Sequence, residues 1–413
     1  MKNKTIQKTD PEISRLIKEE KERQKSSLDL IPSENYPSLA VRQALSSLFM
    51  AKYSEGRPYK RYYAGQKMTD KLETLVEERA RKLFGLSRKK WAVNVQPYSG
   101  SPANYAILRG LLKPGDKIMA LPLSLGGHLT HGASVSLSGI DFKVVNYFLD
   151  KETNLLNYKE IEKIAKRERP KLIICGYTAY PGEVDFKKFS QIAKKVKAYL
   201  LADISHIAGL IAGKVHPSPF PFADVVMTST HKTLRGPRGA MIICRKELEN
   251  QIFKMVFPGL QGGPHEHTIS AIGVALKEAV GPAFRKYISQ VVKNAKILAR
   301  ELKKYNFNLV SGGTDTHLIL IDLREKGISG KEAQELLEKA GIVTNRNAIP
   351  YDPRPPYNPS GLRLGTPAIT TRGMKEKEMK KIAFWINGII SDSSSAARIK
   401  NEVKKLCKKF PIV

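Results

Sequence analysis

The pattern of apolar and polar positions alternates between two kinds of segment. Short apolar runs bounded by proline or glycine are typical of buried strands, whereas apolar residues at helical spacing among charged residues are typical of helices. The chain shows a helical pattern over residues 70–84 and apolar runs over residues 117–121, 171–175, 199–202 and 240–244. This alternation predicts an α/β fold whose mostly parallel sheet is covered by helices on both faces. Ligands bind such sheets beyond the carboxyl ends of the strands, so polar residues there are the candidates for function.

Three parts of the chain differ in pattern. Residues 11–24 are charged with few apolar positions, which predicts an exposed N-terminal helix or arm, and globular patterning begins near Leu28. A long helical pattern over residues 268–304, broken near Gly281 and Pro282, leads to a second unit with an apolar run and closing helices. We therefore expect an arm over residues 1–27, a large unit over residues 28–283 and a smaller α+β unit over residues 284–413.

Charge is the most unusual feature of the composition. The 70 Lys and Arg residues against 39 Asp and Glu residues give a formal net charge of +31. Nucleic acid, an acidic membrane surface, a polyanionic substrate or a lysine-rich surface without a specific partner could each account for this excess. The sequence contains no recognised nucleic-acid-binding module, so nucleic acid is not expected as a partner.

The sequence predicts a protein of the cytoplasm. No apolar run approaches the ~18 residues that a membrane-spanning helix needs. The N-terminus has no hydrophobic stretch of the secretory kind, and its acidic residues argue against a transit peptide. The three cysteines, Cys175, Cys244 and Cys407, are far apart and fit a reducing compartment better than a disulfide scaffold.

Two charged residues follow neighbouring predicted strands. Asp203 ends the run that begins at Tyr199, and Lys232 follows the next run and precedes a Gly/Pro turn. An amine and a carboxylate at one edge of a sheet suit pyridoxal phosphate, whose aldehyde forms a Schiff base and whose ring nitrogen needs an anion. Taken singly, Asp203 could equally cap a helix and Lys232 could be a surface lysine.

Two glycine-containing segments complete this pattern. Ser99, Gly100 and Ser101 stand directly before a helical run, where hydroxyl groups and free N–H groups bind phosphate, although such a loop can also be a plain cap. His128 and His131 have the spacing of a metal pair, but a catalytic zinc site requires a third protein ligand, so no metal is expected. The flanking glycines instead suit a loop that presses an imidazole against a planar ring.

Glu55 and Arg363 are candidates for contacts with a substrate. Glu55 lies among tyrosines between glycines, which suits a proton-transfer group with orienting phenols. Arg363 lies in a short glycine-bounded strand, and a guanidinium grips a carboxylate with two parallel hydrogen bonds. Either residue could also be an ordinary surface charge.

Together these segments resemble the serine hydroxymethyltransferase family of fold-type I pyridoxal-phosphate enzymes, from about Leu28 to the C-terminus. The segments that carry the resemblance are residues 31–36, 52–56, 126–132, 230–236, 256–264 and 365–368. The resemblance implies a large domain with a mostly parallel seven-stranded sheet between helices, followed by a smaller α+β domain. It also implies a homodimer with shared active sites, or a tetramer built from two dimers.

The resemblance further implies roles for individual residues. Lys232 would carry the Schiff base, Asp203 would pair with the pyridine nitrogen, and His128 would stack on the ring. The catalytic set would also include Glu55, Tyr63 and His231. The remaining contacts to pyridoxal phosphate would come from Ser99, Gly100, Ser101, Thr178, His206, Ser229, Tyr53, Gly262 and Gly263. Those to the substrates would come from Ser33, Tyr63, Glu55, His206, Arg238, Arg363 and Asn347, with Arg363 on the carboxylate and Asn347 on the pterin.

The expected reaction is reversible transfer of the serine hydroxymethyl group to tetrahydrofolate, which yields glycine and 5,10-methylenetetrahydrofolate. Tetrahydrofolate would be a co-substrate, and serine and glycine the small-molecule partners. Two alternatives stay open at this stage. One is an aldolase for threonine-like amino acids that needs no folate, and the other is a basic RNA-binding protein.

Overall fold

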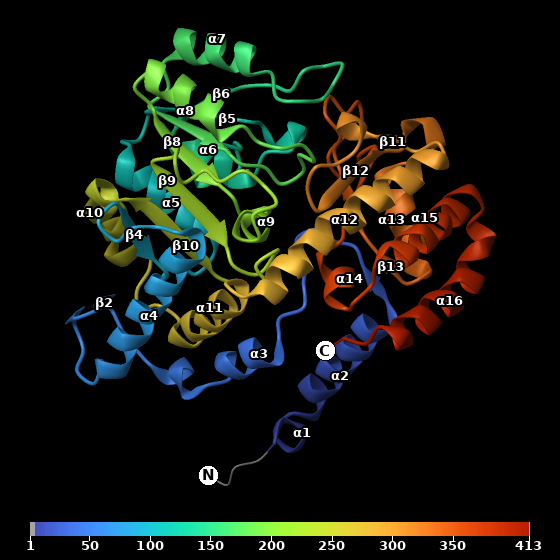
Figure 1. Ribbon diagram of the computed structural model, residues 1–413, viewed down its shortest axis with the longest axis horizontal. Coiled ribbons are helices and arrows are strands. Elements are labelled where there is room, and N and C mark those ends of the chain that lie inside the picture. The colour runs from blue at the N-terminus through green and yellow to red at the C-terminus, as the bar shows by residue number, and fades with distance from the viewer. Residues whose placement is uncertain (1–4, 413) are drawn as a thin grey trace.

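The computed structural model describes residues 5–412, and a seven-stranded sheet forms its centre (Figure 1). The spatial order of the strands is β4-β10-β9-β8-β7-β5-β6. Their bounds are β4 (Trp91–Asn94), β5 (Lys117–Ala120), β6 (Lys143–Asn146), β7 (Leu172–Cys175), β8 (Tyr199–Asp203), β9 (Val225–Ser229) and β10 (Ala240–Arg245). The strands from β9 to β6 pair in parallel, which confirms the predicted mostly parallel sheet.

Strand β10 runs antiparallel to both of its neighbours. The apolar run at residues 240–244 predicted this strand but not its direction. Parallel neighbours need a crossover of a dozen or more residues, usually through a helix. Only residues 230–239 separate β9 from β10 and they form no helix, so the chain returns alongside β9 in the opposite direction.

Helices cover both faces of the sheet, because successive strand residues point to opposite sides. In β8, Leu200 and Ala202 belong to the core on one face and Leu201 to the core on the other. The first face is covered by α4 (Lys67–Phe84), α7 (Tyr158–Glu168), α8 (Phe186–Lys195), α9 (Ala208–Ala212) and α11 (Glu266–Ala279); the second is covered by α5 (Gly100–Leu111) and α10 (Glu249–Lys254). A short helix, α6 (Leu137–Asp141), precedes β6. Within residues 5–412, no helix has both the length and the apolar character needed to cross a membrane.

The C-terminal part forms a second sheet with its own core. The antiparallel order is β11-β12-β15-β14, from β11 (Asn308–Leu309), β12 (Leu318–Asp322), β14 (Asn345–Asn347) and β15 (Gly361–Gly365). The helices are α12 (Pro282–Lys304), α13 (Gly330–Lys339), α14 (Pro367–Thr371), α15 (Glu376–Ser391) and α16 (Ala396–Lys409). The predicted helix break falls where α11 ends and Pro282 begins α12. Figure 1 shows α12, in orange, passing from the large unit into the second one.

The N-terminal segment belongs with the C-terminal unit. The helices α1 (Ile6–Thr9) and α2 (Pro11–Ser26) have no buried residue, as expected for an arm. The next strand, β1 (Leu28–Asp29), pairs with β13 (Ile342–Val343), and Leu28 and Leu30 are fully buried in the C-terminal core. The chain reaches the large unit at α3 (Leu39–Leu45), which packs on α11. The three-part division over residues 1–27, 28–283 and 284–413 stays a prediction.

Arg372 fastens the two ends of the chain together. Its guanidinium donates to the carbonyl oxygens of Ser27 (2.7 Å) and Lys25 (3.1 Å), and to those of Phe410 (2.7 Å) and Cys407 (3.0 Å). These carbonyl groups lie at the C-terminal ends of α2 and α16, where backbone acceptors have no partner within the helix and a cation is favourable. One buried side chain therefore satisfies two helix ends.

We predict that Arg372→Met destabilises the fold, because it leaves four carbonyl groups without their donor. Urea denaturation should show a loss of about 2–4 kcal/mol in the free energy of unfolding. Arg15→Met, which removes an exposed ion pair to Glu19, is the matched control and should change it by less than about 1 kcal/mol. Equal denaturation midpoints for the two variants would contradict the role of Arg372.

Candidate active site

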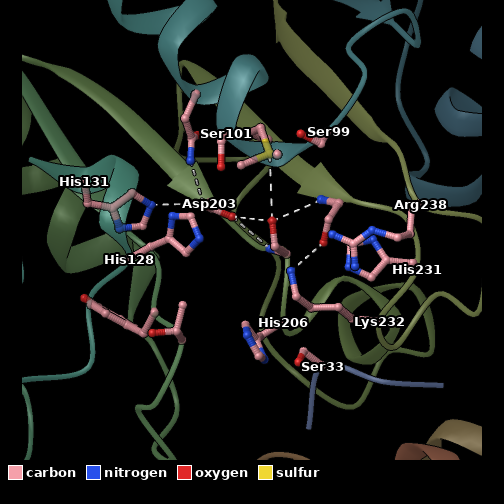
Figure 2. A pocket seen from close by; sticks show the side chains of 17 residues that line it. Ser33, Ser99, Ser101, His128, His131, Asp203, His206, His231, Lys232 and Arg238 are labelled. Carbon is pink, nitrogen blue, oxygen red and sulfur yellow. Dashed lines mark hydrogen bonds and ion pairs between the residues drawn. The ribbon is translucent and has the colours of Figure 1, made fainter. Parts of the chain in front are cut away.

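A cavity of about 240 Å³ lies where β8, β9 and the N-terminal end of α5 meet (Figure 2). It is at the carboxyl ends of the parallel strands, as expected for this class of sheet. Most of the residues singled out from the sequence line it, namely Ser33, Ser99, Gly100, Ser101, His128, Thr178, Asp203, His206, Ser229, His231, Lys232 and Arg238. Five residues that carry no predicted role line it as well, namely Asn104, His131, Tyr177, Ser205 and Met227.

Asp203, the last residue of β8, is buried and bonded through both carboxylate oxygens. His131 Nε2 and Asn104 Nδ2 each lie 2.9 Å from Oδ2, while the hydroxyl and the backbone N–H of Ser205 donate to Oδ1 at 2.6 and 3.1 Å. Burial alone would raise the pKa of Asp203, but the hydrogen bond from His131 and the charges around it hold that pKa well below its usual range. The carboxylate is therefore anionic at neutral pH.

His128 is a neutral imidazole at the same cavity. Burial, reinforced by His131, lowers its pKa to about 4. The backbone N–H of Thr130 donates to Nδ1 (3.2 Å), and the hydroxyl group of Thr130 lies 2.7 Å from the same nitrogen. Because Nδ1 accepts, the proton of the neutral ring resides on Nε2. An uncharged ring fixed in this way is suited to stacking on an aromatic cofactor.

Lys232 follows β9, and its Nζ lies 2.8 Å from the hydroxyl oxygen of Ser229. Burial lowers the pKa of Lys232 from 10.5 to about 8; Asp203 opposes this change, and the charges of Arg363 and Arg238 add to it. The shift increases the unprotonated fraction of the Lys232 amine near neutral pH relative to that of an exposed lysine. The structure provides a nucleophilic amine near neutral pH.

The N-terminal end of α5 provides a phosphate cradle. Ser99 is the N-cap residue, yet its side chain accepts no capping hydrogen bond, so the first N–H groups of the helix keep their capacity to bind an anion. Across the cavity, Nδ1 of His231 is buried without a hydrogen-bond partner among the described residues. An amine, an anionic carboxylate, a neutral imidazole and an anion cradle in one cavity fit pyridoxal phosphate.

The C-terminal unit approaches the cavity through two side chains. Arg363 of β15 is half-buried and donates to the backbone oxygen of Thr178 (2.5 Å) and to Oδ1 of Asn345 (3.2 Å), and desolvation lowers its pKa to about 10. His317 Nε2 lies 3.4 Å from Nδ1 of His206, and burial lowers the pKa of His317 to about 3. Arg363 does not line the cavity, but its charge lowers the pKa of Lys232 and of His206. No sequence motif marks His317 as a residue of this site.

Asn347 lies apart from the cavity. It is the last residue of β14, and its side-chain amide donates to the backbone oxygen of Ala348 at 2.7 Å. The structure therefore does not bring Asn347 together with Lys232 and Asp203.

Glu55 and its tyrosines form a second cluster. Glu55 precedes the two-stranded hairpin of β2 (Gly56–Arg57) and β3 (Lys60–Arg61), and the rings of Tyr53 and Tyr63 lie 5.2 Å apart. A Cβ atom on Gly262 would lie 3.1 Å from Oε1 of Glu55, so this glycine permits the close approach. Tyr53, Gly262 and Gly263 line a separate cavity, and no residue of the cluster lines that of Lys232. In residues 5–412, no group of three or more His, Cys, Asp or Glu side chains is placed to hold a metal ion.

Comparison with known proteins agrees with this geometry. A family model described as serine hydroxymethyltransferase matches residues 6–386. A serine hydroxymethyltransferase from Acidothermus cellulolyticus is 52% identical over 412 residues, which covers 98% of this chain and 96% of the relative. One from Desulfotalea psychrophila is 52% identical over 409 residues, with 98% and 95% covered. The chain therefore belongs to the serine hydroxymethyltransferase family.

Proposed function

We propose that the cavity between Lys232 and Asp203 is where this chain carries out the reaction of its family. That reaction is the reversible transfer of the serine hydroxymethyl group to tetrahydrofolate, which yields glycine and 5,10-methylenetetrahydrofolate. The observation that carries the proposal is the meeting of a nucleophilic amine and a fully bonded, anionic carboxylate in one cavity. A location in the cytoplasm is part of this proposal.

Residues on three sides of the cavity would hold pyridoxal phosphate. Lys232 would attach it, Asp203 would keep its ring nitrogen protonated, and Ser99, Gly100 and Ser101 would bind its phosphate. When bound, pyridoxal phosphate supplies the aldehyde that captures the amino acid and the ring that accepts an electron pair. His128 would lie against the ring, while Thr178, His206, Ser229 and His231 would line the rest of the pocket.

Arg363 would bind the substrate carboxylate. Its guanidinium can present parallel N–H groups to two carboxylate oxygens. Because burial weakens the hydration of this cation, a bound carboxylate would relieve the cost of its charge. Ser33 and Arg238 would contribute further polar contacts from the cavity wall, and Asn347 would contact the pterin of tetrahydrofolate.

We also propose that two copies of the chain share their sites. Glu55 would exchange a proton with the serine hydroxyl oxygen in the partner's cavity, assisted by Tyr53 and Tyr63, with Gly262 and Gly263 beside the partner's cofactor. The separation of this cluster from the Lys232 cavity within one chain supports the arrangement. A homodimer would be the smallest assembly with complete sites.

We predict that Asp203→Asn retains pyridoxal phosphate but loses most turnover. The amide is nearly the same size but has no charge to keep the ring nitrogen protonated, so kcat should fall by about 100-fold or more. Cofactor content by absorbance and kcat with serine and tetrahydrofolate are the two measurements. Turnover within threefold of the unaltered protein would exclude the proposed role of Asp203.

Lys232→Ala should abolish covalent attachment of pyridoxal phosphate. After borohydride reduction and digestion, mass spectrometry should find the pyridoxyl group on the Lys232 peptide of the unaltered chain and on no peptide of the variant. Lys214→Ala, which changes an exposed lysine elsewhere in the large unit, should label normally. A labelled lysine other than Lys232 would refute the assignment.

Mixing two inactive variants tests the shared site. In a dimer of one Lys232→Ala chain and one Glu55→Gln chain, one of the two sites contains both Lys232 and Glu55 if Glu55 acts across the interface. Random reassociation should then restore activity to about a quarter of the sites. Each variant alone is the control, and a mixture no more active than the separate variants would place Glu55 in its own chain's site.

A further inference from the structure

The backbone around Glu55 is held by the guanidinium of Arg61. Nη1 of Arg61 donates to the backbone oxygen of Ser54 at 2.8 Å and to that of Gly56 at 3.0 Å. These two residues stand directly before and after Glu55. One guanidinium therefore fixes the carbonyl groups of both residues that flank Glu55 in the chain.

Arg61 is in turn fixed to a helix of the large unit. Its Nε donates to Oδ1 of Asp70 at 2.8 Å, and its Nη2 lies 2.8 Å from Oε1 of Glu73. Both carboxylates belong to α4, which packs into the core through Val76 and Ala80. The Arg61 side chain is only 3% exposed, so these interactions are shielded from water and its geometry is rigid.

Two further bonds hold Ser54 and Gly56. The hydroxyl of Ser54 donates to Oε1 of Glu266 at 2.6 Å, and Nε2 of Gln96 donates to the backbone oxygen of Gly56 at 2.8 Å. Burial, followed by the charge of Glu73, raises the pKa of Glu266 above its usual range, which favours the protonated form of this carboxyl group. The residues on each side of Glu55 are thus tied to the helices α4 and α11 and to the segment that follows β4.

We infer that Arg61 is the positioning residue for Glu55, acting through the backbone oxygens of Ser54 and Gly56. Arg61 lines none of the surface of the Lys232 cavity. Its effect on catalysis would arise only from where it places the Glu55 carboxylate. This inference rests on the proposed role of Glu55 in proton transfer.

Lysine cannot make the contacts of arginine at position 61, so Arg61→Lys is the variant that tests the inference. A lysine keeps the charge beside Asp70 and Glu73, but it has a single ammonium group and lacks the planar fork that reaches four acceptors. Arg61→Lys should lower kcat with serine and tetrahydrofolate about 10- to 100-fold, since misplacing a catalytic group by about 1 Å has effects of this size. The KM for serine and the absorbance of bound pyridoxal phosphate should change by less than about threefold.

Arg57→Lys is the matched control. Arg57 lies in the same hairpin and also pairs with α4, through Nη2 to Oε1 of Glu77 at 2.6 Å, but its side chain bonds neither of the two carbonyl groups that Arg61 holds. The same substitution there should leave kcat within about twofold. A loss of kcat equal to that of Arg61→Lys would mean that any weakening of the hairpin is sufficient, and would overturn the inference.

A double-mutant cycle decides whether Arg61 acts through Glu55. In a Glu55→Gln background, Arg61→Lys should reduce kcat no further. If Glu55→Gln is impaired and Arg61→Lys slows it again by the full factor, the inference about Arg61 is wrong and the role of Glu55 stands. If Glu55→Gln retains normal kcat, both assignments are wrong.

A milder variant covers the case in which Arg61→Lys yields no folded holoenzyme. Ser54→Ala removes one tie of the same backbone and leaves the ion pairs of Arg61 intact. It should lower kcat roughly threefold to tenfold in the unaltered background and have no effect in Glu55→Gln. An unchanged kcat for Ser54→Ala in that case, or an equal loss in both backgrounds, would overturn the inference.

Discussion

A carboxylate that is buried and still ionised constrains the whole site around it. An unpartnered charge in the position of Asp203 would cost several kcal/mol, so the fold must bring donors to it. The donors come from three segments: Asn104 from α5, His131 from the loop after β5, and Ser205 from the turn that follows β8. Satisfying Asp203 therefore fixes the N-terminal end of α5 relative to β8. That end is also the phosphate cradle, so one requirement sets the spacing between the two ends of the cofactor pocket.

The sequence identified candidate site residues where their position follows from the neighbouring residues in the chain. Asp203 and Lys232 could be found because each directly follows a strand-like run, and the Ser99–Ser101 cradle because it precedes a helix. The partners of Asp203 could not be found in this way, since 72 and 99 residues separate it from His131 and Asn104. The spacing of His128 and His131 shows that the rings are neighbours, but not which ring meets the carboxylate. His317 comes from the other unit, and only the packing of the two units reveals it.

For the fold, too, the sequence did not predict the features that depend on contacts between distant residues. The apolar runs located β5, β7, β8, β9 and β10, and the helical pattern located the break before α12, because these depend on neighbouring residues. No run predicted β4 or β6. The sequence did not reveal that β10 runs antiparallel or that Leu28 and Leu30 complete the C-terminal core, because both depend on strand pairing.

The structure shows where the residues behind the net charge of +31 lie. Basic residues lie on exposed faces of helices such as α12 and α16, whereas the buried cations, among them Arg61 and Arg372, are bonded to carboxylates or carbonyl oxygens. The excess positive charge therefore lies on the solvent-exposed surface. Its electrostatic field favours the approach of anionic substrates.

The contacts of Arg372 have a consequence for biosynthesis. Ser27 emerges from the ribosome 345 residues before Arg372, and Phe410 emerges 38 residues after it. During most of translation, α2 and β1 therefore have neither the arginine nor the strand that they bind in the finished protein. The large unit can assemble around its own core meanwhile, since domains generally fold as units. The N-terminal segment is made long before the residues that it binds, so its contacts can be completed only after Phe410 has been synthesised.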